Sequence, residues 1–158
     1  MKKIIASLFG LCLLAGITAL ADSKPDFSGD WKLNKEKSDF GPIPAPDTLT
    51  HKIDHKDPNL KVTTHQSGGP QGDATYEATY TTDGKECLNQ FGDQLKTKSK
   101  LTWEGAALVV NTDLDFGGTQ MTIKGKWTLS EDGKTMTQTA HIDTPQGPLD
   151  TVYVFDKQ

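Results

Sequence analysis

Hydrophobic and polar residues alternate along most of the chain after its first 21 residues. In the clearest segment, LKTKSKLTW at residues 95–103, two leucines and Trp103 lie on one face and three lysines lie on the other. A helix would distribute those lysines around its circumference, whereas a strand places successive side chains on opposite faces. The pattern predicts a half-buried antiparallel strand.

The same alternation recurs along the rest of the chain, and turn-forming sequences separate the alternating segments. Further segments of this kind span residues 74–80, 108–116, 121–129, 136–142 and 149–155. Between segments lie sequences such as Asp83-Gly84 and Asp132-Gly133, in which glycine supplies the positive φ angle of a tight hairpin. Connections this short join neighbouring strands in antiparallel order. The chain is therefore predicted to form about ten strands in a meander.

A meander of this size leaves two exposed edges unless it closes on itself, and exposed edges promote aggregation. We therefore expect an all-β fold, an antiparallel up-and-down β-barrel of about ten strands. A two-sheet sandwich is the alternative. The sequence shows no amphipathic helix. Prolines at positions 42, 44 and 46 predict that residues 37–48 form an extended, irregular loop.

The first 21 residues have the features of a secretory signal peptide. Lys2 and Lys3 precede an apolar run at residues 4–14, and Ala19 and Ala21 fit a cleavage site. The run is shorter than the roughly 20 apolar residues that a transmembrane helix needs, so a membrane anchor is the weaker alternative. We expect residues 1–21 to be removed and residues 22–158 to form a single domain. The expected location is periplasmic or secreted, with no stable membrane insertion after signal removal.

Charge and cysteine content exclude several classes of function. The net charge is −4, and removal of the two leader lysines brings it to about −6, which disfavours a nucleic-acid partner. Cys87 is the only cysteine beyond the leader. An internal disulfide and a thiolate zinc site are therefore both excluded. Cys87 is predicted to be a small buried hydrophobic residue.

The segment FSGDWKLN, residues 27–34, places Gly29 two positions before Trp31. It resembles the Gly-x-Trp opening strand of lipocalins and fatty-acid-binding proteins, which together are called calycins. The C-terminal TVYVFDK, residues 151–157, resembles the last strand of the fatty-acid-binding branch. Residues 26–46 resemble exported bacterial proteins described as lipocalin-like. The resemblance implies a calycin-like barrel with an internal cavity.

The chain departs from these families in its basic residues. All 17 are lysines. Lipocalins usually pack an arginine near the chain end across the tryptophan, and fatty-acid-binding proteins hold a carboxylate with interior arginines beneath a pair of helices. Because this chain has no arginine and no evident lid helices, the resemblance implies the fold and a cavity but not fatty-acid specificity.

The strand faces predicted to point inward carry polar side chains among aromatic and aliphatic ones. Buried polar groups without partners cost roughly 1–3 kcal/mol each, so a ligand cavity accommodates them better than a packed core does. Gly125 is expected to leave room in the wall. The predicted ligand-binding residues are His51, Gln66, Tyr76, Tyr80, Trp103, Phe116, Trp127, Gln138 and Tyr153.

No catalytic residue, metal site or cofactor is predicted. His51 and His55 share one strand face, but four residues along a strand span about 13 Å, too far for both to bind one ion. The chain has no Gly-x-Ser-x-Gly motif, phosphate loop or paired-acid signature. The first hypothesis is an exported protein that binds a small hydrophobic or weakly polar molecule inside the barrel. The alternatives are a structural or interaction role with a filled core, and a barrel enzyme such as an isomerase or hydrolase.

Overall fold

The computed structural model describes residues 24–69 and 72–158, so the predicted signal peptide lies outside the described residues. Ten β-strands and one short 3-10 helix make up the regular structure of this part of the chain. The elements are β1 (Gly29–Leu33), η1 (Lys35–Lys37), β2 (Thr48–Lys56), β3 (Asn59–Ser67), β4 (Ala74–Thr81), β5 (Glu86–Phe91), β6 (Leu95–Glu104), β7 (Ala107–Phe116), β8 (Thr119–Leu129), β9 (Thr135–Thr144) and β10 (Gly147–Lys157).

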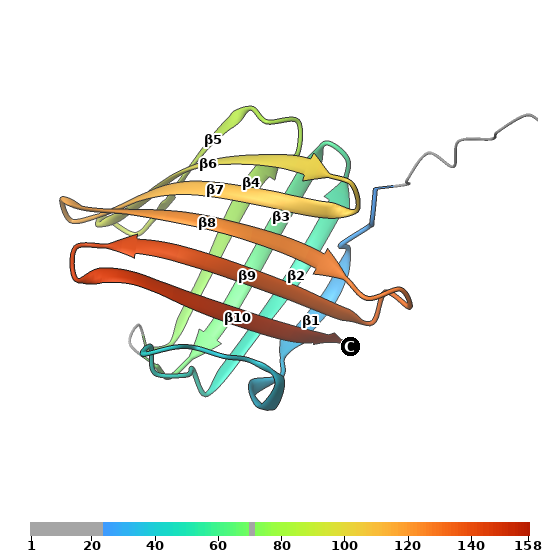
Figure 1. Cartoon of the computed structure of the whole chain (residues 1–158), viewed down its shortest axis with the longest axis horizontal. Coiled ribbons are helices and arrows are strands. Elements are labelled where there is room, and N and C mark those ends of the chain that lie inside the picture. Colours follow the sequence, from blue (N-terminus) through green and yellow to red (C-terminus); the bar gives the residue numbers. More distant parts are fainter. Residues whose placement is uncertain (1–23, 70–71) are drawn as a thin grey trace, which may run out of the picture.

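The ten strands form one antiparallel sheet in the order β4-β3-β2-β1-β10-β9-β8-β7-β6-β5. Hydrogen-bonded neighbours in this sheet are consecutive strands of the chain, with one exception. The exception is β1, which pairs with β10 and so joins the first strand to the last. Figure 1 shows β1 to β4 crossing behind β6 to β10, so the sheet curls around an interior. The predicted all-β, up-and-down barrel of about ten strands is confirmed. The barrel is nearly closed, and it is not the two-sheet sandwich of the alternative.

Alternation along each strand decides which side chains face the interior. In β6, Ser99 and Leu101 are buried while Lys98 and Lys100 are exposed. This is the inward and outward assignment that the sequence predicts for residues 95–103. The outer lysines remain solvated, so charge is kept out of the barrel at these positions.

The Gly-x-Trp motif begins the strand that closes the sheet. Gly29 has a φ of +135°, and a Cβ at this position would lie 2.6 Å from Cε of Lys157. The Nζ atom of Lys157 lies 5.2 Å from the ring centroid of Trp31, a distance suited to a cation–π contact. Glycine is therefore required both by its backbone conformation and by the lysine that crosses it. In this chain, which has no arginine, a lysine thus covers the tryptophan.

One end of the barrel is filled with side chains. Trp31 is 1% exposed, and its Nε1 donates to the carbonyl of Phe27 at 2.9 Å. The ring of Phe27 stacks against Trp103 with centroids 6.0 Å apart. Other fully buried apolar residues of this packed region are Leu60, Leu101, Leu108 and Met136. Burying each large side chain stabilises the fold by about 1.5–3 kcal/mol.

The segment between β1 and β2 contains η1 and the proline-rich loop at residues 38–47. Asp39 and Val152 exchange two backbone hydrogen bonds of 2.7 Å, which fasten the loop to β10. The ring of Phe40 packs against Tyr153 with centroids 5.2 Å apart. The short η1 is the only helix among residues 24–69 and 72–158, and no helix of that part of the chain has the length and apolarity to cross a membrane.

Candidate functional site

Above the closed end, the barrel encloses a cavity of about 690 Å³. Its walls come from both halves of the sheet, with residues of β2, β3 and β4 facing residues of β6, β7, β8 and β9. Trp127 contacts the closed end, since its ring meets Phe27 edge-on at 6.1 Å. The apolar lining consists of Val62, Ala74, Ala78, Phe91, Leu95, Leu114, Phe116 and Trp127.

A second cavity of about 440 Å³ adjoins the first. His51, Tyr76 and Gln138 line both cavities, so these three residues lie where the two meet. The second cavity extends beneath the proline-rich loop, where Ile43, Pro44 and Pro46 supply part of its wall. The loop therefore contributes apolar surface to the interior, and this role was not predicted from the sequence.

His51 is the main polar group at the junction of the cavities. Its Nδ1 lies 2.9 Å from the Thr64 hydroxyl, and its ring lies 4.6 Å from the ring of Phe155. Burial lowers the pKa of His51 to about 4, because the apolar surroundings disfavour the charged form. The ring is neutral at neutral pH, so one nitrogen donates a hydrogen bond and the other accepts one.

Two further polar side chains make weak hydrogen bonds or none with the described residues. The Gln138 amide makes one weak contact among the described residues, from Nε2 to the Met136 sulfur at 3.7 Å. The Thr97 hydroxyl oxygen, in the wall of the larger cavity, is buried without a hydrogen-bond partner. Leaving such groups unpaired is unfavourable. The Gln138 amide is therefore available to a ligand or to water inside the cavity.

The three tyrosines of the chain contribute neutral phenols to the interior. Burial raises the pKa of Tyr80 to about 12, with smaller contributions from Tyr76 and Cys87. Burial also raises the pKa values of Tyr76 and Tyr153. All three hydroxyls consequently keep their protons at neutral pH and carry no charge.

The structure brings eight of the nine predicted ligand-binding residues into the walls of these cavities. His51, Tyr76, Tyr80, Phe116, Trp127 and Gln138 line the larger one, and Gln66 and Tyr153 join the smaller one. That these side chains contact a ligand stays a prediction.

Trp103 and Gly125 are placed differently from the expectation. Trp103 lines neither cavity, because its Nε1 donates to Asp57 at 2.9 Å and its ring stacks on Phe27 at the closed end. A Cβ on Gly125 would lie 2.8 Å from the Thr139 carbonyl oxygen. That glycine permits a close approach of two backbones, and it does not widen the cavity. Alternation alone puts Trp103 on the inward face but cannot say at which end of the barrel it lies.

Several lining residues were missed as ligand contacts by the sequence reasoning. Thr64 lines the larger cavity, and identifying it as the partner of His51 requires knowing that the two residues pair across β2 and β3. Phe91 is the last residue of β5 and packs against Tyr76 with centroids 5.1 Å apart. Its position two residues from Asn89 on an alternating strand was the available signal.

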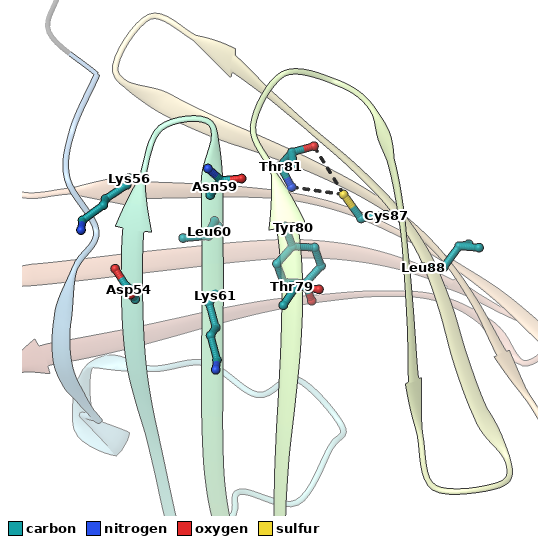
Figure 2. Close-up of a pocket in the computed structure, with 10 residues that line it drawn as sticks. All are labelled: Asp54, Lys56, Asn59, Leu60, Lys61, Thr79, Tyr80, Thr81, Cys87 and Leu88. Carbon is teal, nitrogen blue, oxygen red and sulfur yellow. Dashed lines mark hydrogen bonds between the residues drawn. The ribbon is translucent and has the colours of Figure 1, made fainter.

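The wall has a seam between β4 and β5, which are the two ends of the sheet order and form no backbone ladder in the described structure. The Asn89 side chain takes the place of a neighbouring strand. Its Oδ1 accepts from the Thr79 amide at 2.9 Å and its Nδ2 donates to the Thr79 carbonyl at 3.1 Å. The sulfur of Cys87 accepts from the Thr81 amide at 3.1 Å (Figure 2). Cys87 is half-buried, not fully buried as predicted, and it bonds across the seam.

Outside the seam lies a cleft of about 430 Å³, shown in Figure 2. The side chains of Lys56, Lys61 and Leu88 point in different directions there, not toward a common centre. Leu88 is 71% exposed, and Lys61 pairs with the exposed carboxylate of Glu77 at 2.8 Å. The larger interior cavity has more volume than this cleft and a mostly apolar lining with a few polar groups, so the interior is the better candidate site.

Metal binding has no support in the described part of the chain. Among residues 24–69 and 72–158, no group of three or more His, Cys, Asp and Glu side chains is placed to hold an ion. His141 instead lies on the exterior, with Nδ1 2.7 Å from a carboxylate oxygen of Asp150.

Comparison with known proteins places the fold among calycin-like barrels. No family model and no curated protein matches the chain. The zebrafish ileal bile acid-binding protein, crystallised with cholic acid, is similar with a TM-score of 0.59 and 18% identity, over 84% of this chain and 98% of that chain. The fluorescent protein UnaG gives a TM-score of 0.56 and 17% identity, over 84% and 97%. A secretory abundant heat soluble protein from Ramazzottius varieornatus gives 0.60 and 12%, over 83% and 94%.

Proposed function

We propose that this protein is an exported binding protein that holds a small, mostly apolar molecule inside its barrel. The observation that carries the proposal is the cavity of about 690 Å³, whose mostly apolar walls include the polar side chains of His51 and Gln138. Its volume is in the range of small-molecule sites. The solved barrels of similar fold include one whose name states that it binds bile acids, which is a precedent for ligand binding within this architecture.

The alternatives have weaker support. A structural or interaction barrel with a filled core would need the interior to be packed from end to end, whereas only the closed end is packed. A cluster of His51 with a carboxylate inside the cavity would favour a barrel enzyme. The lining residues of the two cavities include no Asp or Glu.

The binding proposal is tested by titrating the purified protein with the uncharged fluorescent probe N-phenyl-1-naphthylamine. We expect its emission to rise with saturation and the Trp127 fluorescence to change. The variant Ala74→Trp would place an indole in the larger cavity and should abolish the signal, while Glu77→Trp on the exposed face of the same strand should preserve it. A silent titration with folded protein, or equal signals from both variants, would contradict the proposal.

Export is proposed on the sequence of residues 1–21 and has a separate test. Expression of the full chain in a Gram-negative host should give a periplasmic product that begins at Asp22, as read by intact-mass measurement. Replacing the apolar leader residues Leu13 and Leu14 with Asp should keep the product in the cytoplasm at its full length. Recovery of the unprocessed chain from the cytoplasm for both versions would refute export and leave the binding proposal standing.

A further inference from the structure

The two cavities lack charged side chains altogether. Their lining residues include no Lys, Asp or Glu, and the full chain contains no arginine. The lysines nearest along β6, such as Lys96 and Lys98, lie on the exposed face of that strand. A ligand that carries an ionised group into this space would meet no opposite charge, although it would lose its hydration.

His51 does not supply the missing positive charge. It is the only basic side chain in the lining, and its pKa of about 4 leaves roughly one ring in a thousand protonated at neutral pH. The titratable groups that share the cavities with it are Tyr76, Tyr80 and Tyr153, whose pKa values burial raises. These phenols are neutral and offer no counter-charge.

Hydrogen-bonding capacity is nevertheless concentrated at one place. His51 and Gln138 both line the junction of the two cavities. His51 is paired with Thr64 through one ring nitrogen only, and the Gln138 amide has no strong partner among the described residues. Together they present both donors and acceptors, which suits a hydroxyl, carbonyl or amide group.

We propose that the cavity selects an uncharged, largely apolar ligand whose single hydroxyl, carbonyl or amide group binds between His51 and Gln138, and that it rejects the carboxylate form of the same molecule. This inference rests on the binding function proposed above and adds the chemical class of the ligand. The apolar walls take up the body of the molecule, and the junction orients its polar end. The ionised form is excluded because no opposite charge in the cavity offsets the free-energy cost of removing water from the carboxylate.

Three molecules with one apolar body test the selection: dodecan-1-ol, dodecanamide and dodecanoate, each used to displace N-phenyl-1-naphthylamine. At about pH 8, where dodecanoate is ionised, we expect the alcohol and the amide to bind at least about tenfold more tightly than the acid, because an unpaired buried charge is costly. The affinity of the acid should rise toward that of the alcohol as the pH falls and its carboxyl group becomes protonated.

Two variants locate the polar contact. Gln138→Leu should weaken binding of dodecan-1-ol by about tenfold, once the affinity of this variant for N-phenyl-1-naphthylamine has been measured by direct titration. Gln138→Lys adds a positive charge at the junction and should reverse the preference in favour of dodecanoate. Thr139→Val, on the exposed neighbouring position of β9, is the matched control and should change neither affinity. Thermal melting confirms that each variant is folded.

The possible outcomes separate the two proposals. If the folded protein binds neither the probe nor any of the three molecules, both the binding function and the inference fail. If alcohol and carboxylate bind equally at about pH 8, or the carboxylate binds more tightly, the binding function stands and the inference is overturned. If the alcohol is preferred but Gln138→Leu has no effect, the assignment of the polar end to this junction is overturned.

Discussion

The two ends of the barrel are built from the same strands and the same alternating pattern, yet one end is solid and the other is hollow. On β9, Met136 at the closed end is completely buried, whereas Gln138, two residues further on the same face, lines both cavities. Inward direction therefore does not by itself decide between packing and ligand contact.

The difference arises from what lies between the two halves of the sheet. At the closed end, the segment before β1 inserts Phe27, which stacks on Trp103 and meets Trp127 edge-on. At the open end, the proline-rich loop lies against β10 and lines only the smaller cavity. Side chains from outside the strands therefore fill the space between the two halves of the sheet at the closed end, whereas at the open end they form part of a cavity wall.

The largest expected effect comes from truncating the same residue type at each end. Leu101→Ala at the closed end should destabilise the protein by about 2–5 kcal/mol, because it leaves a cavity in a packed region. Leu114→Ala in the cavity wall should cost about 1–2 kcal/mol, since this side chain has fewer partners to lose. Urea denaturation of the purified variants measures both values. Equal losses would show that the open end is packed as tightly as the closed end.

The next effect is the pH dependence of stability at the open end. The folded-state pKa of His51 is lowered from 6.5 to about 4, so between these pH values the unfolded chain binds more protons. The contribution of His51 is complete above the unfolded value and is lost as the pH falls toward about 4, by roughly 3 kcal/mol in total. Denaturation of the wild type and His51→Gln across this range isolates the contribution.

His141→Gln is a useful contrast for that measurement. The hydrogen bond to Asp150 raises the pKa of His141, so its contribution is present at low pH and is lost as the pH rises through the folded-state value. The two variants should therefore change the pH profile in opposite directions. A His51→Gln profile parallel to that of the wild type would show that His51 is not desolvated.

The smallest effect concerns the seam that connects the two ends of the sheet. Asn89→Ala removes both side-chain hydrogen bonds to Thr79 and should destabilise the protein by about 1–2 kcal/mol. Asn89→Asp keeps an acceptor for the Thr79 amide, so this amide should stay better protected against hydrogen exchange than it is in Asn89→Ala. Hydrogen exchange of the Thr79 amide reports the change. Gln90→Ala, whose amide bonds only to Gly92 nearby, should leave that exchange unaltered.

Much of the architecture follows from the sequence because alternation is a local property. Period-two patterning in segments such as residues 95–103 marks the strand and its inward face, and glycine-containing turns mark where the chain reverses. The eight predicted residues found in the cavity walls were identified in this way. Trp103 satisfied the same pattern and lies elsewhere, because depth along the barrel axis is not encoded in a single strand.

By itself, then, the sequence determined the strands, their order as a meander and the side of the sheet that faces inward. Only the tertiary structure decided where the interior is filled, that Lys157 covers Trp31, and that Asn89 bonds across the seam. Most of these features join residues far apart in the chain, such as Phe27 with Trp127 or Trp31 with Lys157. Their positions depend on how the closed sheet brings strands face to face, and a short-range pattern does not contain that information.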